Sequence, residues 1–121
     1  MNTEMATRIS FKDGESIFSD GEIGNCAYVV QDGSVEIFKK TEDGEVKVGL
    51  VEKGGIFGEM ALLDDEPRSA DARAKRPTTL MKIDRELFKK HVSDCSPFIQ
   101  GLLRIFCKNS RAMLSDHVTK I

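Results

Sequence analysis

Residues 57–72 read FGEMALLDDEPRSADA, a glycine-glutamate pair followed by a one-turn helical run, an acidic loop and a Pro-Arg-Ser-Ala return into the next strand. Gly58 lets the backbone approach a ligand closely, because glycine has no side chain and tolerates unusual dihedral angles. Residues 59–63 offer backbone N–H groups at a helix N-terminus, where donors and dipole together stabilise an anion. Arg68 carries a planar guanidinium that forks onto two phosphate oxygens. The segment therefore predicts a cradle for one phosphate group.

Glu59, next to this cradle, indicates what carries the phosphate. A carboxylate repels a phosphate but accepts a hydrogen bond from a ribose hydroxyl, so the two residue types together imply a nucleotide. Ordinary alternatives exist for both residues: Arg68 could be a solvated surface cation near the acidic loop, and Glu59 could only complement the helix dipole. We favour the ligand interpretation because Gly58, Glu59, Arg68 and Ser69 are all present together.

The segments 57–63 and 67–70 resemble the phosphate-binding cassette of the cyclic nucleotide-binding domain family, and the bacterial catabolite-activator type of sensor in particular. The resemblance covers nearly the whole chain, from about Arg8 through the C-terminal helix. It implies that Glu59 holds the ribose 2′-OH and that Arg68 holds the cyclic phosphate. It also implies cAMP, in preference to cGMP, as the ligand. The remaining ligand contacts would come from Gly58, Met60, Ala61, Ser69 and Ala70.

Two positions beside the cassette need separate treatment. Ser69 could be only a small residue at a strand start, or its hydroxyl could contact the phosphate or, in relatives that hold guanine in syn, the guanine amino group. Asp71 stands where the family often has threonine or an apolar residue, and a carboxylate close to a bound phosphate would weaken binding. Strand alternation relative to Ala70 and Ala72 predicts that the Asp71 side chain points outward and is harmless.

Turn signals organise the first two thirds of the chain. Asp-Gly pairs favour tight hairpin turns, and they begin at Asp13, Asp20, Asp32 and Asp43. They separate β-prone segments near 8–12, 16–18, 26–31, 34–40 and 45–51, and two further segments near 70–75 and 78–84 follow the cassette. In the segment 45–51 the apolar residues Val46, Val48 and Leu50 alternate with others, which predicts one buried face. Short antiparallel strands with regular turns indicate a jelly-roll-like β-roll of about eight strands over about 8–84.

The last third has a helical period. Asp84 can cap a helix over 85–92, and Ser96 can cap a second helix that starts at Pro97 and runs to about 118. The apolar arc of the second helix is broader than docking on a roll requires, and comprises Phe98, Ile99, Leu102, Leu103, Ile105, Phe106, Met113 and Leu114. The arc either packs within one chain or forms a homodimer seam, as in the transcription factors that the chain resembles. In that branch the base is reached at about Leu114 and Ser115.

Composition excludes several classes of function. The 121 residues suffice for one core, so we expect a single domain over 1–121. A net charge of −2 provides no basic surface for nucleic acid. No apolar run approaches the ~20 residues of a membrane span, and the N-terminus does not read as a signal peptide. Three cysteines without a C-x-x-C pair favour a reducing compartment. We expect a cytoplasmic protein with neither a nucleic acid nor a membrane as its own partner.

An enzyme is the weakest alternative. A cupin-like metal enzyme needs several histidine and carboxylate ligands on strands, whereas His91 and His117 both fall in the helical part. We expect no metal, cofactor or catalytic residue. The sequence instead predicts a regulatory domain in which binding of a cyclic nucleotide moves the C-terminal helices. The rival is a module of the same fold that has lost ligand affinity and serves interaction or dimerisation.

Overall fold

The computed structural model describes the backbone of residues 6–63 and 66–119, and the side chains of these ranges except those at 6, 63, 87, 91, 107 and 110–119. Eight strands in this part form two four-stranded antiparallel sheets. The first has the order β1 (Ala6–Phe11), β8 (Thr78–Asp84), β3 (Cys26–Asp32), β6 (Ile56–Phe57). The second has the order β2 (Ser16–Phe18), β7 (Asp71–Ala74), β4 (Ser34–Thr41), β5 (Gly44–Glu52). The helices are α1 (Met60–Leu63), α2 (Arg85–Ser93) and α3 (Pro97–Thr119).

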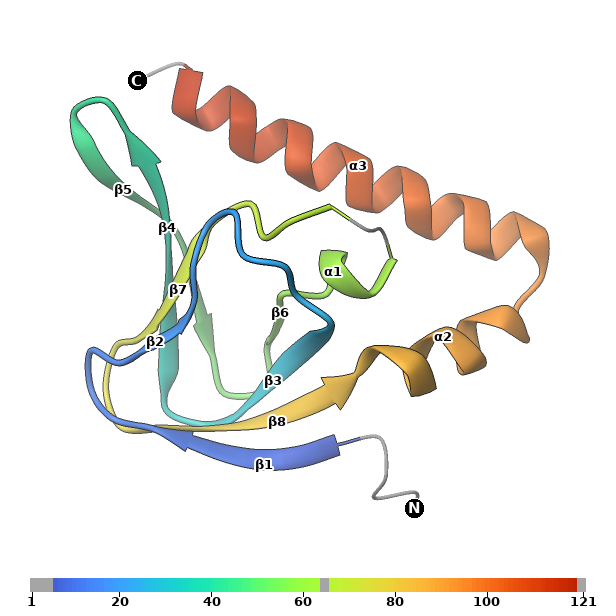
Figure 1. Ribbon diagram of the computed structural model, residues 1–121, viewed down its shortest axis with the longest axis horizontal. Helices are drawn as coiled ribbons and strands as arrows, with labels where there is room; N and C mark the ends of the chain where they lie inside the picture. Colours follow the sequence, from blue (N-terminus) through green and yellow to red (C-terminus); the bar gives the residue numbers. More distant parts are fainter. Residues whose placement is uncertain (1–5, 64–65, 120–121) are drawn as a thin grey trace.

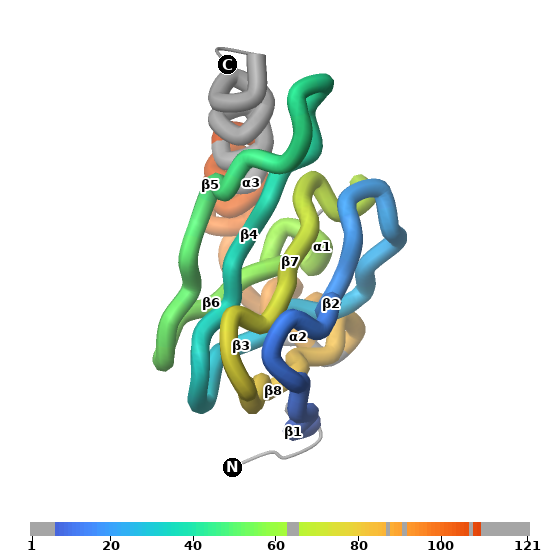
Figure 2. Tube along the Cα trace, turned by 90° about the vertical axis from the view of Figure 1, so that its left-hand side faces the viewer, coloured from blue at the N-terminus to red at the C-terminus, as the bar shows by residue number. Residues whose placement is uncertain are grey.

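The two sheets form a roll, which confirms the predicted fold class. Figure 2 shows the strands of the second sheet side by side, in the order β5, β4, β7, β2 from left to right. The short helix α1 lies between the roll and α3, and the long α3 crosses over one end of the molecule (Figure 1). Because α1 contacts β3, α2 and α3, the cassette helix connects the roll to the C-terminal helices.

An aromatic cluster from three different strands forms the centre of the core. The rings of Phe18, Tyr28 and Phe57 lie with centroids 5.4 to 6.3 Å apart. Val30, Val35 and Leu80 are fully buried around it, and burial of such a side chain stabilises the fold by about 1.5–3 kcal/mol. The cluster lies directly under the cassette, because β6 leads from Phe57 into Gly58.

The predicted helix caps are present, but of the predicted hairpin turns only the one at Asp43 joins two strands, β4 and β5, that pair with each other among the described residues. The glycines of all four Asp-Gly pairs have positive φ, between 81° and 119°. The backbone N–H of Glu86 donates to Asp84 Oδ1 at 2.7 Å, and that of Ile99 donates to Ser96 Oγ at 3.3 Å. These side chains satisfy donors that the first turn of a helix leaves without an intrahelical partner.

The sequence reading of two strands needs correction. The pairing of β4 with β5 skips Val48, and such a bulge places the residues that follow it on the opposite face. Leu50 is therefore 41% exposed, and Val51 packs against the core in its place. The strand β6 was not predicted, because two residues are too few to show a period.

Candidate functional site

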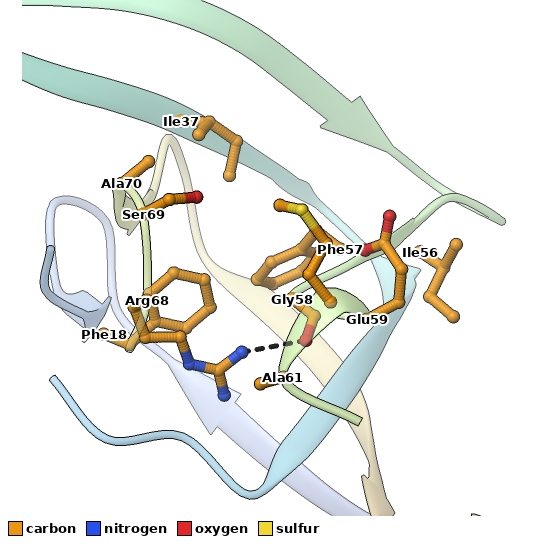
Figure 3. Close-up of a pocket in the computed structure, with 11 residues that line it drawn as sticks. Phe18, Ile37, Ile56, Phe57, Gly58, Glu59, Ala61, Arg68, Ser69 and Ala70 are labelled. Atoms are coloured by element: carbon orange, nitrogen blue, oxygen red, sulfur yellow. Dashed lines mark hydrogen bonds between the residues drawn. The ribbon is translucent and has the colours of Figure 1, made fainter. Parts of the chain in front are cut away.

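A cavity of about 160 Å³ opens at the cassette. Its walls come from β2, β4, β6, α1 and the segment before β7, and its lining is Phe18, Ile37, residues 56–61 and residues 68–70. All seven predicted ligand contacts lie in this lining (Figure 3). The fold therefore brings the two halves of the cassette, which are separated by the acidic loop, to the same cavity.

Arg68 is the most unusual side chain of the site, because it is charged and only 5% exposed. Its Nη1 donates to the Gly58 carbonyl at 2.9 Å, the contact drawn in Figure 3, and its Nη2 donates to the Cys26 carbonyl at 2.7 Å. The Phe18 ring lies against the guanidinium, with Cζ 4.1 Å from the ring centroid. Nε is buried and has no hydrogen-bond partner.

No carboxylate neutralises this cation: among the ion pairs that join described residues, none includes Arg68. Burying an unpaired charge costs several kcal/mol. The two carbonyl bonds contribute about 1.5–3 kcal/mol each, and the ring contact contributes roughly 0.5–2 kcal/mol. These contacts hold the guanidinium in place without cancelling its charge. The solvated-surface interpretation of Arg68 is therefore wrong, and the cavity wall carries a positive charge that an anion can neutralise.

Gly58 and α1 form the next part of the wall. Gly58 has a φ of 75°, the left-handed region that glycine enters without strain. The N–H groups of Ala61 and Leu62 donate to the carbonyls of Gly58 and Glu59, at 3.3 and 3.0 Å. The expectation that all N–H groups of this helical turn are free is therefore wrong for these two. The four-residue helix closes on itself, and Arg68 supplies the main positive charge.

Glu59 is half-buried in the same lining. In Figure 3 its side chain lies beside Ile56 and its carboxylate points away from the Arg68 guanidinium. Among the ion pairs of the described residues none joins Glu59 to Arg68. Each side chain therefore stays available to a different part of one ligand.

A charged network holds the segment that carries Ser69. Lys39 Nζ donates to the Ser69 carbonyl and to Asp20 Oδ2, at 2.5 and 3.2 Å. Asp71 Oδ1 accepts the backbone N–H of Asp20 at 2.6 Å, and Asp71 Oδ2 lies 3.9 Å from Lys40 Nζ. Asp71 does not line the cavity and lies, as predicted, on the face of β7 opposite Ala70 and Ala72, but it is only 7% exposed. The turn at Asp20 covers this face of β7, and the Asp71 carboxylate fastens that turn.

Several functional neighbours were missed in the sequence. Phe18 and Cys26, which contact Arg68, precede it by more than forty residues and belong to no motif. Ile37 and Ile56 give the mouth of the cavity an apolar side. Burial raises the pKa of the nearby Tyr28 phenol above its usual range, and a hydrogen bond with Cys26 adds to this effect. The ring therefore stays neutral. Only the spatial order of the strands brings these residues to the cassette.

Other expectations concern the remainder of the molecule. Within the described part of the chain no three His, Cys, Asp or Glu side chains are grouped so that they could hold a metal ion. A search of the same part found no helix with the length and apolar character of a membrane span. The side chains of Leu114, Ser115, His91 and His117 fall outside the described residues. Their predicted roles stay predictions.

Comparison with known proteins places this geometry in a family. The family model described as "Cyclic nucleotide-binding domain" matches residues 8–94. The chain is 39% identical, over 82 residues, to a cAMP-dependent protein kinase regulatory subunit of Emericella nidulans, with 68% of this chain and 19% of that protein covered. It is 44% identical, over 78 residues, to a cGMP-dependent protein kinase of Plasmodium berghei, with 64% of this chain and 9% of that protein covered. The chain thus spans about a fifth or less of these relatives.

Among solved structures, the cAMP-bound form of the EAL enzyme Bd1971 superimposes with a TM-score of 0.83 at 32% sequence identity. The superposition covers 90% of this chain and 30% of that one. The matched family model, the shared roll and a cavity lined by both halves of the cassette agree with one another. The chain belongs to the cyclic nucleotide-binding domain family.

Proposed function

We propose that this chain is a regulatory sensor domain, not an enzyme, that binds a 3′,5′-cyclic purine nucleotide, cAMP in preference to cGMP. The observation that carries the proposal is the buried Arg68 guanidinium, which no carboxylate among the described residues neutralises and which borders a cavity shared with Glu59. A cyclic phosphate supplies the missing negative charge. The ribose attached to it supplies the hydroxyl that donates a hydrogen bond to the Glu59 carboxylate.

The dimensions of the cavity indicate how such a ligand lies. Its volume of about 160 Å³ is below the ~300 Å³ at which pockets begin to enclose drug-sized ligands. Phosphate and ribose fit against Arg68 and Glu59, with the backbone around Gly58, Met60, Ala61, Ser69 and Ala70 as further contacts. The base then lies at the mouth, beside Ile37 and Ile56, which offer apolar contact.

The choice of cAMP over cGMP rests on the resemblance of the cassette, since the relatives include both kinds. A cAMP-dependent kinase regulatory subunit and a cAMP-bound structure are among the similar proteins, and so are a cGMP-dependent kinase and the cGMP-bound form of the same EAL enzyme. Ser69 lines the cavity, where its hydroxyl can meet either the phosphate or a guanine amino group. We therefore assign the preference to cAMP and make cGMP the competitor in the test.

Coupling to the helices follows from the place of α1. Met60 and Ala61 line the ligand cavity, while the next residue, Leu62, is buried against a cleft that α2 and α3 border through Val92 and Gln100. A ligand that contacts Met60 and Ala61 therefore also acts on the packing of Leu62 against α2 and α3. Only a ligand with different affinity for two helix arrangements shifts their populations, and contact with α1 provides that difference.

The exposed apolar side chains of α3 support a homodimer that forms through helix 97–118. Phe98 is 74% exposed and Phe106 is 58% exposed, and Ile99 and Ile105 are exposed between them. Apolar groups gathered on one helix usually mark an interaction site. A module that only dimerises is the second candidate function. We place the protein in the cytoplasm, since Cys26 is a buried cysteine that forms no disulfide.

Calorimetric titration of the purified chain with cAMP, cGMP and 5′-AMP tests the proposal. We expect saturable 1:1 binding of both cyclic nucleotides, tighter for cAMP, and much weaker binding of 5′-AMP. Hydrogen exchange with and without cAMP should show changed protection in α2 and α3. A folded chain that binds none of the three nucleotides would leave the dimerisation module as the function, and tighter binding of cGMP would reverse the assigned preference.

A further inference from the structure

Gly24, in the connection between β2 and β3, leaves the space that the Arg68 guanidinium occupies. It is buried although it lies outside every strand and helix. A Cβ built on Gly24 would overlap Arg68 Nε and Cζ and would stand 2.6 Å from Nη2. These three atoms define the plane of the guanidinium, and they lie at similar distances from the added atom. Gly24 therefore approaches the flat face of the group.

Gly24, Gly58 and Phe18 together form a slot, the space that the Arg68 guanidinium occupies. A Cβ at Gly58 would stand 2.7 Å from Arg68 Nη1, and the Phe18 ring lies against the guanidinium at 4.1 Å. The slot also explains how a buried cation is held although no carboxylate among the described residues pairs with it. Its hydrogen-bond partners are the carbonyls of Gly58 and Cys26, and its walls are glycine backbone and an aromatic ring.

The need for glycine differs between the two positions. Gly58 has positive φ, so its backbone alone favours glycine. Gly24 is not among the residues with positive φ, so a side chain there meets no backbone strain of that kind. The contact with Arg68 is what excludes a Cβ at position 24. The three atoms nearest to such a Cβ all belong to Arg68, so removing the Arg68 side chain should relieve the closest overlap.

We infer that Gly24 is a positioning residue for ligand binding: by leaving the slot open, it sets where Arg68 presents its charge to the phosphate. This inference rests on the proposed function. An alanine at position 24 would push the long Arg68 side chain out of its bonds to Cys26 and Gly58. The roll would survive, because the displaced group is the flexible end of a side chain, but the anion site would move.

A double-mutant cycle tests the contact without any ligand. Gly24→Ala and Arg68→Ala are compared, alone and together, by thermal unfolding. We expect Gly24→Ala to lower Tm by about 3 °C or more in the wild-type background, and to leave Tm unchanged or slightly raised when Arg68 is already alanine. Gly49→Ala is the matched control, because its Cβ would meet Ile37 at an ordinary 3.7 Å. An equal loss of Tm in both backgrounds would overturn the inference that Gly24 accommodates the Arg68 guanidinium.

The second readout is affinity for cAMP by calorimetry. Gly24→Ala should bind at least tenfold more weakly than wild type, and should add no further loss to Arg68→Ala, because both act on the same group. Wild-type affinity in a folded Gly24→Ala variant would refute the positioning role. If the wild type binds neither cyclic nucleotide, the proposed function and the ligand role of Gly24 both fail. The unfolding cycle then still decides whether Gly24 accommodates Arg68.

Discussion

Replacing Arg68 by alanine is the most direct perturbation of the site, and the structure sets its size. A charge-assisted contact to phosphate is worth about 1.5–3 kcal/mol, which corresponds to roughly 10- to 150-fold weaker binding. Arg68→Lys should recover only part of this loss, because an ammonium cannot fork onto two oxygens. A lysine also cannot reach both the Gly58 and Cys26 carbonyls as the guanidinium does.

The same substitution has opposing effects on stability. Arg68→Ala removes a donor from the Cys26 carbonyl, at about 1–3 kcal/mol for a buried group left unpaired. It also removes a buried charge that pairs with no described carboxylate and whose Nε lacks a hydrogen-bond partner among the described residues, and this relief is of similar size. We therefore expect a free energy of unfolding within about 1 kcal/mol of wild type, so that the variant stays folded and its affinity can be measured.

Calorimetry with cAMP, alongside urea unfolding of each variant, is the assay. Arg73→Ala is the matched control, because Arg73 also lies over a phenylalanine ring, at 4.0 Å, but pairs with Glu45 on the exposed face. It should bind cAMP as wild type does. A folded Arg68→Ala variant with unchanged affinity would show that the phosphate does not meet this residue, and the assigned cavity would be wrong.

Four further outcomes are expected. Glu59→Ala should weaken cAMP binding by about 1–3 kcal/mol and Glu59→Gln by less; in a cycle with 2′-deoxy-cAMP, additive losses would mean that carboxylate and 2′-OH do not meet. Asp71→Ala should lower the free energy of unfolding in urea by about 1–3 kcal/mol, because the Asp20 N–H loses its acceptor; an unchanged midpoint would argue against that role. Because the pKa of Tyr28 is raised in the fold, the unfolded phenol ionises above about pH 10 while the folded one stays neutral, so the free energy of unfolding should fall as pH rises there. Tyr28→Phe should remove the contribution of this residue to that fall. An identical pH profile of stability in wild type and variant would contradict this assignment. Phe106→Glu should convert a wild-type dimer to a monomer in light scattering, whereas a monomeric wild type would exclude the α3 interface.

Short-range patterns in the sequence predicted most of the secondary structure. The Asp-Gly turns, the caps at Asp84 and Ser96 and the strand segments depend on residues within a few positions of one another. The same holds for the cassette, whose residues lie within fourteen positions and reach one cavity as predicted. The alternation in β5 failed at Val48, since a bulge depends on pairing with β4 and leaves no mark in the periodicity of one strand.

The sequence by itself predicted residues that line one cavity, and it predicted two separate ligand tasks for Arg68 and Glu59, which stay predictions. It did so because their chemistry and close spacing are local properties. Only the tertiary structure decided that Arg68 is buried with no ion pair to a described carboxylate. It is held by the carbonyls of Cys26 and Gly58 and by the Phe18 ring, with Gly24 against its face. The tertiary structure also decided that Asp71, on the outer face of β7, is buried by the turn at Asp20 and accepts its backbone N–H. Burial and charge compensation depend on which distant segments become neighbours, and strand order sets that only when the roll has closed.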